Sequence, residues 1–252
     1  MKISIITVCL NAADTIEETI QSVFTQTYSP VEYIVIDGKS TDGTLEILHK
    51  YKHRFAALIS EKDTGLYAAI NKGVKMATGD VIGILHADDM YTSANVLEEM
   101  VALVSHTNSD AVYADLEYVR RENPSQIVRY WKSGKYKNDS FRLGWMPPHP
   151  TFFVKRTIYE RFGYFNESFT SAGDYEFMLR VIHIHKIKLA YWPHVAVRMR
   201  LGGKSNKSLT NRLKANNEDV KAWEVNGLKT PAFISLLKPF RKVPQFFPKL
   251  FK

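Results

Sequence analysis

The chain has 252 residues, of which 45% are hydrophobic and 24% charged, an ordinary composition for a globular protein with one substantial core. Its single cysteine, Cys9, excludes a disulfide framework and a cysteine-based metal site. No run reaches the roughly 18 apolar residues of a membrane span, and the first residues lack a signal-peptide cleavage pattern, so we expect a cytoplasmic protein. Its net charge of +8 suggests acidic partners.

The first 110 residues alternate between short apolar runs and amphipathic segments. The runs expected to form strands span residues 3–8, 33–36, 57–60 and 81–85. The segments expected to form helices span residues 16–25, 44–51, 67–77 and 94–105. Because strands and helices alternate with short connections, the pattern predicts an α/β domain with a largely parallel sheet. Ligands of such sheets bind beyond the carboxyl ends of the strands, where Asn11, Asp37 and Asp88 fall.

The second half has a mixed pattern and ends in a tail of unusual composition. The strands expected there span residues 111–118, 127–131, 151–154 and 190–199, and a helix is expected over 174–184. The tail, residues 228–252, holds six Lys or Arg, five Phe and four Pro, and no acidic residue. Basic residues between large apolar ones suit the surface of an anionic bilayer, while proline limits a long helix. The alternative is that the phenylalanines pack on the body and the lysines are solvated.

The apolar run that begins at Ile82 ends abruptly in Asp88 and Asp89. Two adjacent carboxylates at the end of a buried strand are unfavourable unless a cation or hydrogen-bond donors face them. Successive strand side chains point to opposite faces, so either the chain bends or the two residues divide the work. Oxygen ligands suit Mg²⁺ or Mn²⁺, and Mg²⁺ usually takes one or two carboxylates plus substrate phosphates. The pattern therefore indicates a nucleotide diphosphate held through a divalent cation, with a solvated turn as the alternative.

Four further residues are candidates, each with a structural alternative. Asp37 could bind a base or ribose, or cap its own turn. Asp63 and Lys72 supply an acid and a base near the expected phosphate site, or lie on a solvated helix face. Asp174, at a helix start, is either a cap or a general base, a role that contributes about 10²- to 10⁴-fold to rate.

Three weaker signals stay open. His149 and His194 could each face the site, His194 even as an extra metal ligand, although both residues are more often structural. The segment 202–205, Gly-Gly-Lys-Ser, is either a phosphate-closing loop or a plain turn.

Together these segments resemble the family 2 glycosyltransferases, whose catalytic domain has the GT-A fold. The resemblance covers about residues 1–205 and rests on the ordered segments SIITVCLN (4–11), VIDGKSTDGT (35–44), EKDTGLYAAINKG (61–73), GDVIGILHADD (79–89), GYFNESF (163–169) and AGDYEFMLR (172–180). It implies a domain over residues 1–227, with a nucleotide-sugar half to about residue 110 and an acceptor half beyond it.

The resemblance also implies an activity and a set of residues. The activity is inverting transfer from a nucleotide-diphosphate sugar to a hydroxyl of a glycan or polyprenyl-linked acceptor, in polysaccharide biosynthesis at the inner membrane face. The nucleotide-sugar-binding residues that it implies are Thr7, Asn11, Asp37, Asp63, Lys72 and Asp88. Asp88 and Asp89 would bind Mn or Mg, with Asp89 on the metal and Asp88 nearer the ribose, and Asp174 would deprotonate the acceptor hydroxyl.

The chain departs from the family pattern at three places. Gly38 replaces the second of two acids after the second strand, His86 replaces the first acid of the D-x-D motif, and Gly173 replaces the acid before Asp174. The first departure puts one nucleoside contact in doubt, and the second leaves fewer ligands for the metal.

Two other classes of enzyme or binding protein, and the nucleic-acid binders, are alternatives to a glycosyltransferase. A sugar-phosphate nucleotidyltransferase would carry a glycine-rich loop after the first strand, and residues 10–14 hold no glycine. A non-catalytic carbohydrate-binding module would need neither a metal site nor Asp174. We expect no nucleic-acid partner, since the main basic cluster is the tail rather than a basic face with stacking aromatics.

Overall fold

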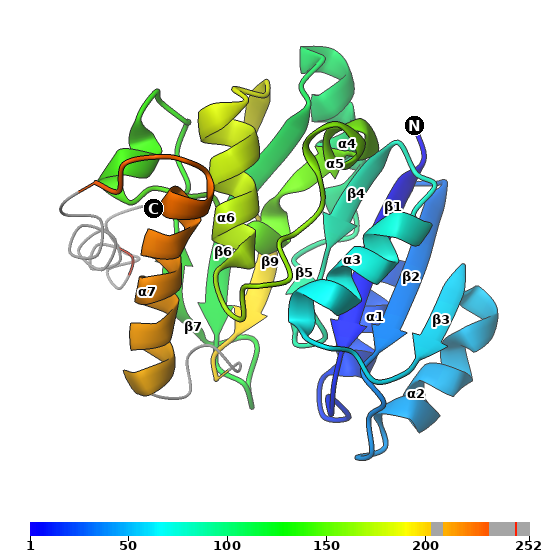
Figure 1. Ribbon diagram of the computed structural model, residues 1–252. Coiled ribbons are helices and arrows are strands. Elements are labelled where there is room, and N and C mark those ends of the chain that lie inside the picture. The colour runs from blue at the N-terminus through cyan, green and yellow to red at the C-terminus, as the bar shows by residue number, and fades with distance from the viewer. Residues whose placement is uncertain (203–208, 232–244, 246–252) are drawn as a thin grey trace.

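The computed structural model describes residues 1–202, 209–231 and 245 (Figure 1). The strands are β1 (Ile3–Cys9), β2 (Val31–Asp37), β3 (Ala57–Ser60), β4 (Val81–Ile84), β5 (Asp89–Tyr91), β6 (Ala111–Val119), β7 (Ile127–Trp131), β8 (Phe153–Lys155) and β9 (Leu189–Arg200). They form one sheet in the order β3-β2-β1-β4-β8-β6-β9-β5, with β7 added beside β6. Strands β1 to β4 pair in parallel, as do β6 and β9, whereas β5, β7 and β8 pair antiparallel.

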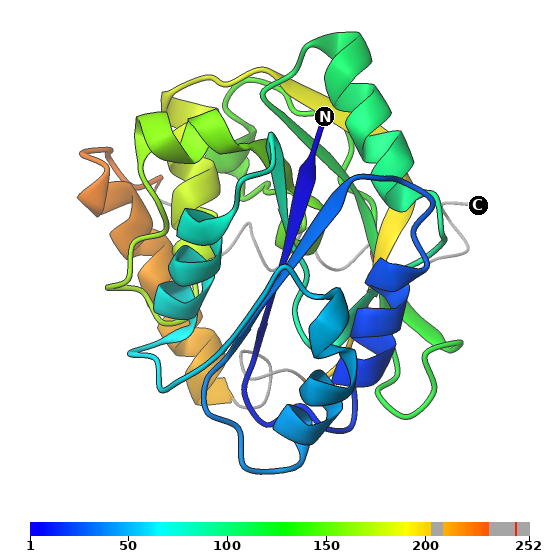
Figure 2. The same cartoon turned by 90° about the vertical axis from the view of Figure 1, so that its right-hand side faces the viewer.

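Helices cover both faces of this sheet (Figures 1 and 2). The α-helices are α1 (Ile16–Phe24), α2 (Thr44–Tyr51), α3 (Leu66–Met76), α4 (Val96–Thr107), α5 (Arg156–Phe162), α6 (Gly173–Met178) and α7 (Leu209–Val225). Helices α1, α2 and α4 pack on one face, and α3, α5, α6 and α7 on the other. A π-helical turn (Leu179–Ile184) continues α6, and short 3-10 turns lie at Lys52–Arg54, Ser140–Leu143 and His149–Thr151.

The apolar run of β1 is continuous because both of its faces are covered. Ile3 and Ile5 belong to the core cluster under α1, α2 and α4, whereas Ile6 and Val8 belong to the cluster under α3 and α6. This period of two decides where each polar residue of the strand points. Thr7 shares the face of Ile3 and Ile5, away from α3 and α6.

The predicted α/β class with a largely parallel first half is confirmed. All predicted strands and helices are present, with ends that shift by one or two residues. The pattern did not predict β5, α5 or α7: β5 has three residues, and of the α7 side chains that are described, Ala222 and Trp223 supply the core contacts. The expected helix over 174–184 divides into α6 and the π-helical turn.

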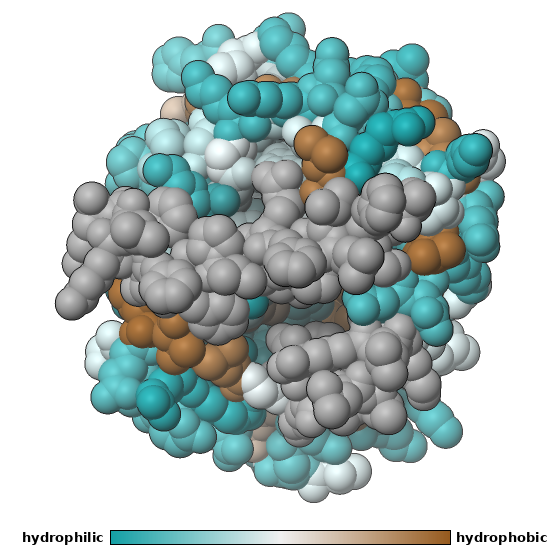
Figure 3. Space-filling model, turned by 90° about the vertical axis from the view of Figure 1, so that its left-hand side faces the viewer, coloured by the Kyte–Doolittle hydropathy of each residue, from teal (hydrophilic) through white to brown (hydrophobic). Residues whose placement is uncertain are grey.

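Leu228, at the start of the predicted tail, contacts the body of the protein. Leu228 packs against the core cluster, and its N–H donates to the Trp223 carbonyl at 2.9 Å. Most of the predicted tail, and residues 203–205 of the predicted phosphate loop, lie outside the described residues. On the molecular face that carries α7, the apolar side chains that can be seen form small groups between hydrophilic ones (Figure 3). Among the described helices, none combines the length and apolarity that a bilayer crossing requires.

Candidate functional site

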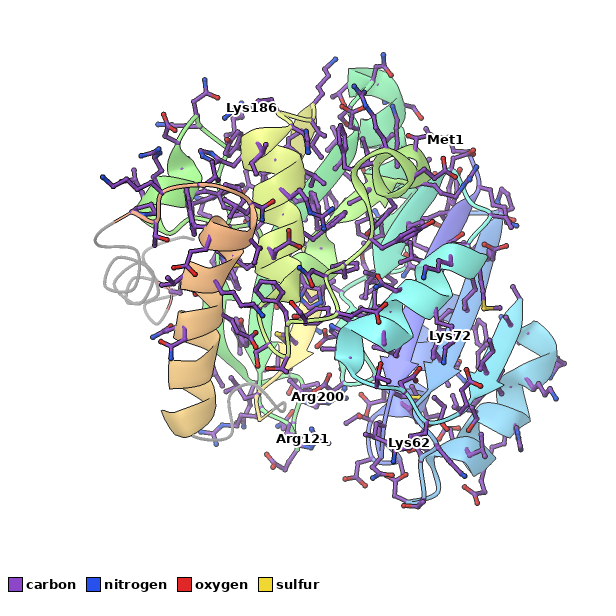
Figure 4. All side chains as sticks on the ribbon, in the orientation of Figure 1. Met1, Lys62, Lys72, Arg121, Lys186 and Arg200 are labelled. Atoms are coloured by element: carbon purple, nitrogen blue, oxygen red, sulfur yellow. The ribbon has the colours of Figure 1, made fainter. Side chains whose placement is uncertain are left out.

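The predicted site residues gather mainly at one edge of the sheet. Strand β1 runs away from Met1, and β9 ends at Arg200 on the opposite edge, the edge at which Lys62 also lies (Figure 4). The carboxyl ends of β1, β2 and β4 lead into the segments that hold Asn11, Asp37 and Asp88. This is the edge where open parallel sheets bind ligands.

Asp174 lies at the start of α6, with its side chain 22% exposed. The Tyr67 hydroxyl donates to its Oδ1 at 3.3 Å, and Nδ1 of His149 lies 3.5 Å from its Oδ2. A Cβ on Gly173 would lie 2.7 Å from Cε2 of Tyr67. Glycine at this position therefore makes room for the tyrosine ring, which gives the departure from the family pattern at Gly173 a steric explanation.

His86 and His149 meet behind Asp174. Their Nε2 atoms lie 2.6 Å apart, a hydrogen-bond distance in which one ring must donate and the other accept. Burial lowers the pKa of both imidazoles to about 4, with the neighbouring His149 adding to the effect on His86. Both effects favour the neutral form of each ring. His149 lies beside Asp174, with which it lines a small pocket together with Phe152 and Phe177, and its place in a donor or acceptor site stays a prediction.

Asp88 and Asp89 have very different surroundings. Asp88 is half-buried, whereas Asp89 is fully buried in β5, and neither of its carboxylate oxygens has a hydrogen-bond partner among the described residues. Burial and the charge of Asp88 raise the pKa of Asp89 well above its ordinary value, against the opposing effect of Arg200. Arg200 itself is 1% exposed and donates to the Asp88 carbonyl oxygen at 3.2 Å and to Glu18.

This environment bears on the expected metal site. Asp88 is the more exposed of the two residues, whereas Asp89, the residue expected on the metal, is fully buried in the strand. Among the described residues there is no group of three or more His, Cys, Asp or Glu side chains arranged to hold a metal. Of the two adjacent carboxylates, that of Asp88 is therefore the one accessible to a cation.

The loops after β1 and β2 hold one another through Asn11 and Asp37. Oδ1 of Asn11 accepts the Thr41 N–H at 2.9 Å, and the Asn11 N–H donates to the Ser40 hydroxyl at 2.8 Å. Asp37 is fully buried, and its carboxylate accepts hydrogen bonds from the hydroxyls of Ser40 and Ser60. Asp37 therefore caps its own turn, the structural alternative considered above, and Asn11 is the more exposed of the two.

Lys72 is bound to two carboxylates. Its Nζ lies 2.5 Å from Oδ1 of Asp63 and 2.6 Å from Oε1 of Glu61. The hydrogen bond that Lys72 donates to Asp63, together with the one to Glu61, raises the pKa of Lys72. Asp63 and Lys72 therefore lie together, as expected, but as an ion pair in which the charge of the lysine is already compensated.

Two predicted residues lie away from this cluster. Thr7 is fully buried and shares a 3.0 Å hydrogen bond with the Tyr33 hydroxyl, so the structure does not group it with the other candidates, and its expected nucleoside contact stays a prediction. His194 lines a separate surface pocket with Trp192, Asn95 and Glu99, so the structure does not bring it to Asp88 as a metal ligand.

Two residues that the sequence did not single out support Asp174. Tyr67 contacts its carboxylate directly. Glu218 of α7 accepts hydrogen bonds from the backbone N–H groups of Thr170, Ser171 and Ala172, the segment that leads into α6. Burial would raise the pKa of Glu218, but these bonds outweigh it and lower that pKa. No local sequence signal identifies either residue, because both contacts join segments far apart in the chain.

Comparison with known proteins gives one family and several relatives. The sequence profile described as Glycosyl transferase family 2 matches residues 4–168. A PGL/p-HBAD biosynthesis glycosyltransferase of Mycobacterium bovis (strain BCG / Pasteur 1173P2) is 31% identical over 209 residues, which cover 81% of this chain and 78% of the relative. The uncharacterized glycosyltransferase YwdF of Bacillus subtilis (strain 168) is 30% identical over 194 residues, covering 75% of this chain and 70% of the relative.

Solved structures share the fold. TarS 1-349 of S. aureus superposes with a TM-score of 0.68 at 19% identity, over 96% of this chain and 71% of that one. The mannosyltransferase PcManGT from Pyrobaculum calidifontis, in complex with GDP-Man and Mn²⁺, has a TM-score of 0.70 at 20% identity, over 99% and 74% of the two chains. At these identities the likeness shows the fold alone, and it confirms the expected GT-A architecture.

Proposed function

The chain belongs to glycosyltransferase family 2, and we propose that it is an inverting enzyme that moves a sugar from a nucleotide-diphosphate sugar to a hydroxyl of a glycan or lipid-linked acceptor. The observation that carries the proposal is the setting of Asp174: its side chain is 22% exposed, Tyr67 donates to its carboxylate, and it lies next to His149, which contacts His86 in the segment that leads to Asp88. Comparable solved proteins were captured with UDP-GlcNAc and with GDP-Man, which supports a donor of this class.

Asp174 has the properties of a general base. Its Oδ1 accepts the hydroxyl of Tyr67, and its Oδ2 lies near His149, so the carboxylate is held in place while its side chain stays accessible. In the proposed reaction it takes the proton of the acceptor hydroxyl as that oxygen attacks the anomeric carbon opposite the diphosphate. The bond to the diphosphate breaks with its electron pair, and the configuration at that carbon inverts.

A divalent cation, Mn²⁺ or Mg²⁺, fits this site if the donor supplies most of its oxygen ligands. We propose that Asp88, rather than the buried Asp89 expected from the family resemblance, meets it together with oxygens of the donor diphosphate. When bound, such a cation neutralises charge that builds on the leaving diphosphate. The complex of PcManGT with GDP-Man and Mn²⁺ supports this part of the proposal.

The remaining expectations on the donor site also stay proposals. Asn11 and the pair of Asp63 and Lys72 lie at or near the strand edge where a nucleoside diphosphate would sit. Asp37 acts one step back by fixing the turn at 38–41, which positions the Asn11 loop. We propose that residues 1–110 form the nucleotide-sugar half and residues 111–227 the acceptor half.

Acceptor and location rest on composition. The basic and aromatic tail (228–252) supports a peripheral position on the cytoplasmic face of an anionic membrane, with a lipid-linked or polysaccharide acceptor. One relative is named for PGL/p-HBAD biosynthesis, and a biosynthetic role of that general kind accords with the proposal.

A thermal-shift screen of UDP-, GDP- and dTDP-sugars with Mn²⁺ tests the donor class. A ligand at 100 times its Kd stabilises the folded chain by about 2.7 kcal/mol, which for a protein of this size raises Tm by several degrees. Stabilisation by one nucleotide sugar supports the proposal. An equal rise in Tm with free nucleoside triphosphates, together with release of pyrophosphate in an activity assay, would instead indicate nucleotidyl transfer.

A further inference from the structure

We infer that His149 is a positioning residue for Asp174, held in one tautomer by His86: the Nε2–H of His86 donates to Nε2 of His149, and the Nδ1–H of His149 points at Oδ2 of Asp174. The inference rests on the proposed role of Asp174 as the base and names the residues that aim it. It also gives a role to His86, the residue that replaces an acid in the family motif.

The distances show that the three side chains contact one another in the order His86, His149, Asp174. Nε2 of His86 and Nε2 of His149 are 2.6 Å apart, and Nδ1 of His149 is 3.5 Å from Oδ2 of Asp174. The two rings lie 4.6 Å apart between centroids, with 59° between their planes. The three residues come from the segment after β4, the turn at His149–Thr151 and the start of α6, so their contacts join the two halves of the domain.

The two neutral tautomers of His149 are not equivalent here. If His149 donated from Nε2 to His86, its Nδ1 would carry a lone pair facing the Asp174 carboxylate, and two acceptors would repel each other. If His86 donates from Nε2, the Nδ1 of His149 carries the proton and presents a donor to the carboxylate. A doubly protonated His149 would satisfy both contacts but would place a cation in a buried setting, which burial opposes.

The resulting arrangement fixes both oxygens of the base. Tyr67 donates to Oδ1 at 3.3 Å, and Nδ1 of His149 lies 3.5 Å from Oδ2, slightly farther than a normal N–H···O hydrogen bond. Because Nδ1 of His149 already carries a proton, His149 orients Asp174 and does not receive the acceptor proton. Holding a reacting group in its productive orientation is worth a large factor in rate, and it affects kcat more than donor affinity.

The tautomer is observable without turnover. In a long-range ¹H–¹⁵N spectrum of the ¹⁵N-histidine-labelled full chain at pH 7.5, we expect His149 to show a protonated Nδ1 and a bare Nε2, and His86 to show a protonated Nε2. The signals are assigned by side-chain correlations to Cβ and by loss of one signal in His149→Asn. A protonated Nε2 on His149, or an imidazolium, overturns the inference while leaving the proposed glycosyltransferase activity untouched.

Matched substitutions separate positioning from a purely structural role. Asparagine places an amide donor near the position of Nδ1, whereas glutamine reaches the position of Nε2 and leaves Asp174 without that donor. With the donor sugar found by the screen, we expect His149→Gln to lower kcat about 10-fold or more with donor KM changed less than about threefold, and His149→Asn to restore most of kcat. The exposed His53, treated with the same pair of substitutions, serves as control.

The outcomes are distinct. Equal losses in His149→Asn and His149→Gln, or a loss confined to KM, overturn the positioning role even if both variants fold. If the wild-type chain turns over no nucleotide sugar, the proposed function fails, while the tautomer measurement still decides the inference about the histidines.

Discussion

Replacing Gly173 by alanine should destabilise the protein and disturb the base that follows it. The added Cβ would lie 2.7, 2.8 and 2.9 Å from three ring carbons of Tyr67. That ring is 3% exposed and stacked on Phe165 with centroids 5.8 Å apart, so it has no free space into which to move. Overpacking of this kind costs about 1–3 kcal/mol, and the better helix propensity of alanine returns at most about 1 kcal/mol at the first residue of α6.

The net loss expected for Gly173→Ala is therefore about 1–2 kcal/mol in the free energy of unfolding. Urea unfolding followed by tryptophan fluorescence measures it, since Trp223 is fully buried. Gly65→Ala is the matched control: a Cβ there meets nothing within 4 Å, and a φ of 169° is extended backbone open to any residue. We expect that control to change stability by less than about 0.5 kcal/mol.

A double-mutant cycle identifies the contact responsible. If the Tyr67 ring is the obstacle, Gly173→Ala should cost less in a Tyr67→Leu background, with a coupling energy of about 0.5–2 kcal/mol. Equal stability of wild type and Gly173→Ala, or a cost that is unchanged without the ring, would refute the steric explanation for glycine at this position.

Three further predictions concern the cation, the support of α6 and the tail. Asp88→Asn should weaken Mn²⁺-dependent donor binding about 10-fold or more, whereas Asp89→Asn should leave it within a few-fold, because Asp89 is buried. Isothermal titration calorimetry measures both affinities, and a larger loss in Asp89→Asn than in Asp88→Asn would contradict the assignment of the cation to Asp88. Because the folded pKa of Glu218 lies below its ordinary value of 4.5, the stability that its carboxylate adds is present at pH 7 and lost as pH falls through the lowered pKa. Glu218→Gln should therefore be less stable than wild type at pH 7 in urea unfolding, and the difference should shrink as pH falls below the ordinary value of 4.5 and through the lowered pKa; a difference that stays constant argues against the charge. Removal of residues 232–252, which spares the packed Leu228, should reduce sedimentation with anionic vesicles, and equal binding would return the tail to a role on the protein body.

Much of the fold follows from period and composition. The continuous apolar run of β1 required cover on both faces, and the structure places α1 with α2 on one and α3 on the other. The same period of two places Thr7 on the face of Ile3 and Ile5, where it bonds to Tyr33.

The site was only partly predictable, because its central contacts join distant segments. His86 and His149 are 63 residues apart in the chain, and Tyr67 and Asp174 are 107 apart. No spacing rule connects them, and the turn chemistry that placed Asp174 at a helix start says nothing of its neighbours. Similarly, the adjacent Asp88 and Asp89 predicted that their like charges destabilise each other. Their unequal burial, however, depends on β9, which pairs with β5 from more than 100 residues downstream.

The measurement closest to the central claim compares wild type with Asp174→Asn, using the nucleotide sugar that binds best. Nucleotide-diphosphate release and donor Kd are recorded for both. If Asp174 is the base of the transfer, kcat should fall by about 10²- to 10⁴-fold while Kd stays within a few-fold, because the amide keeps the size of the side chain but cannot take a proton. A variant that retains near-normal turnover, or that loses donor binding in proportion to rate, would contradict the assignment of Asp174 as the base.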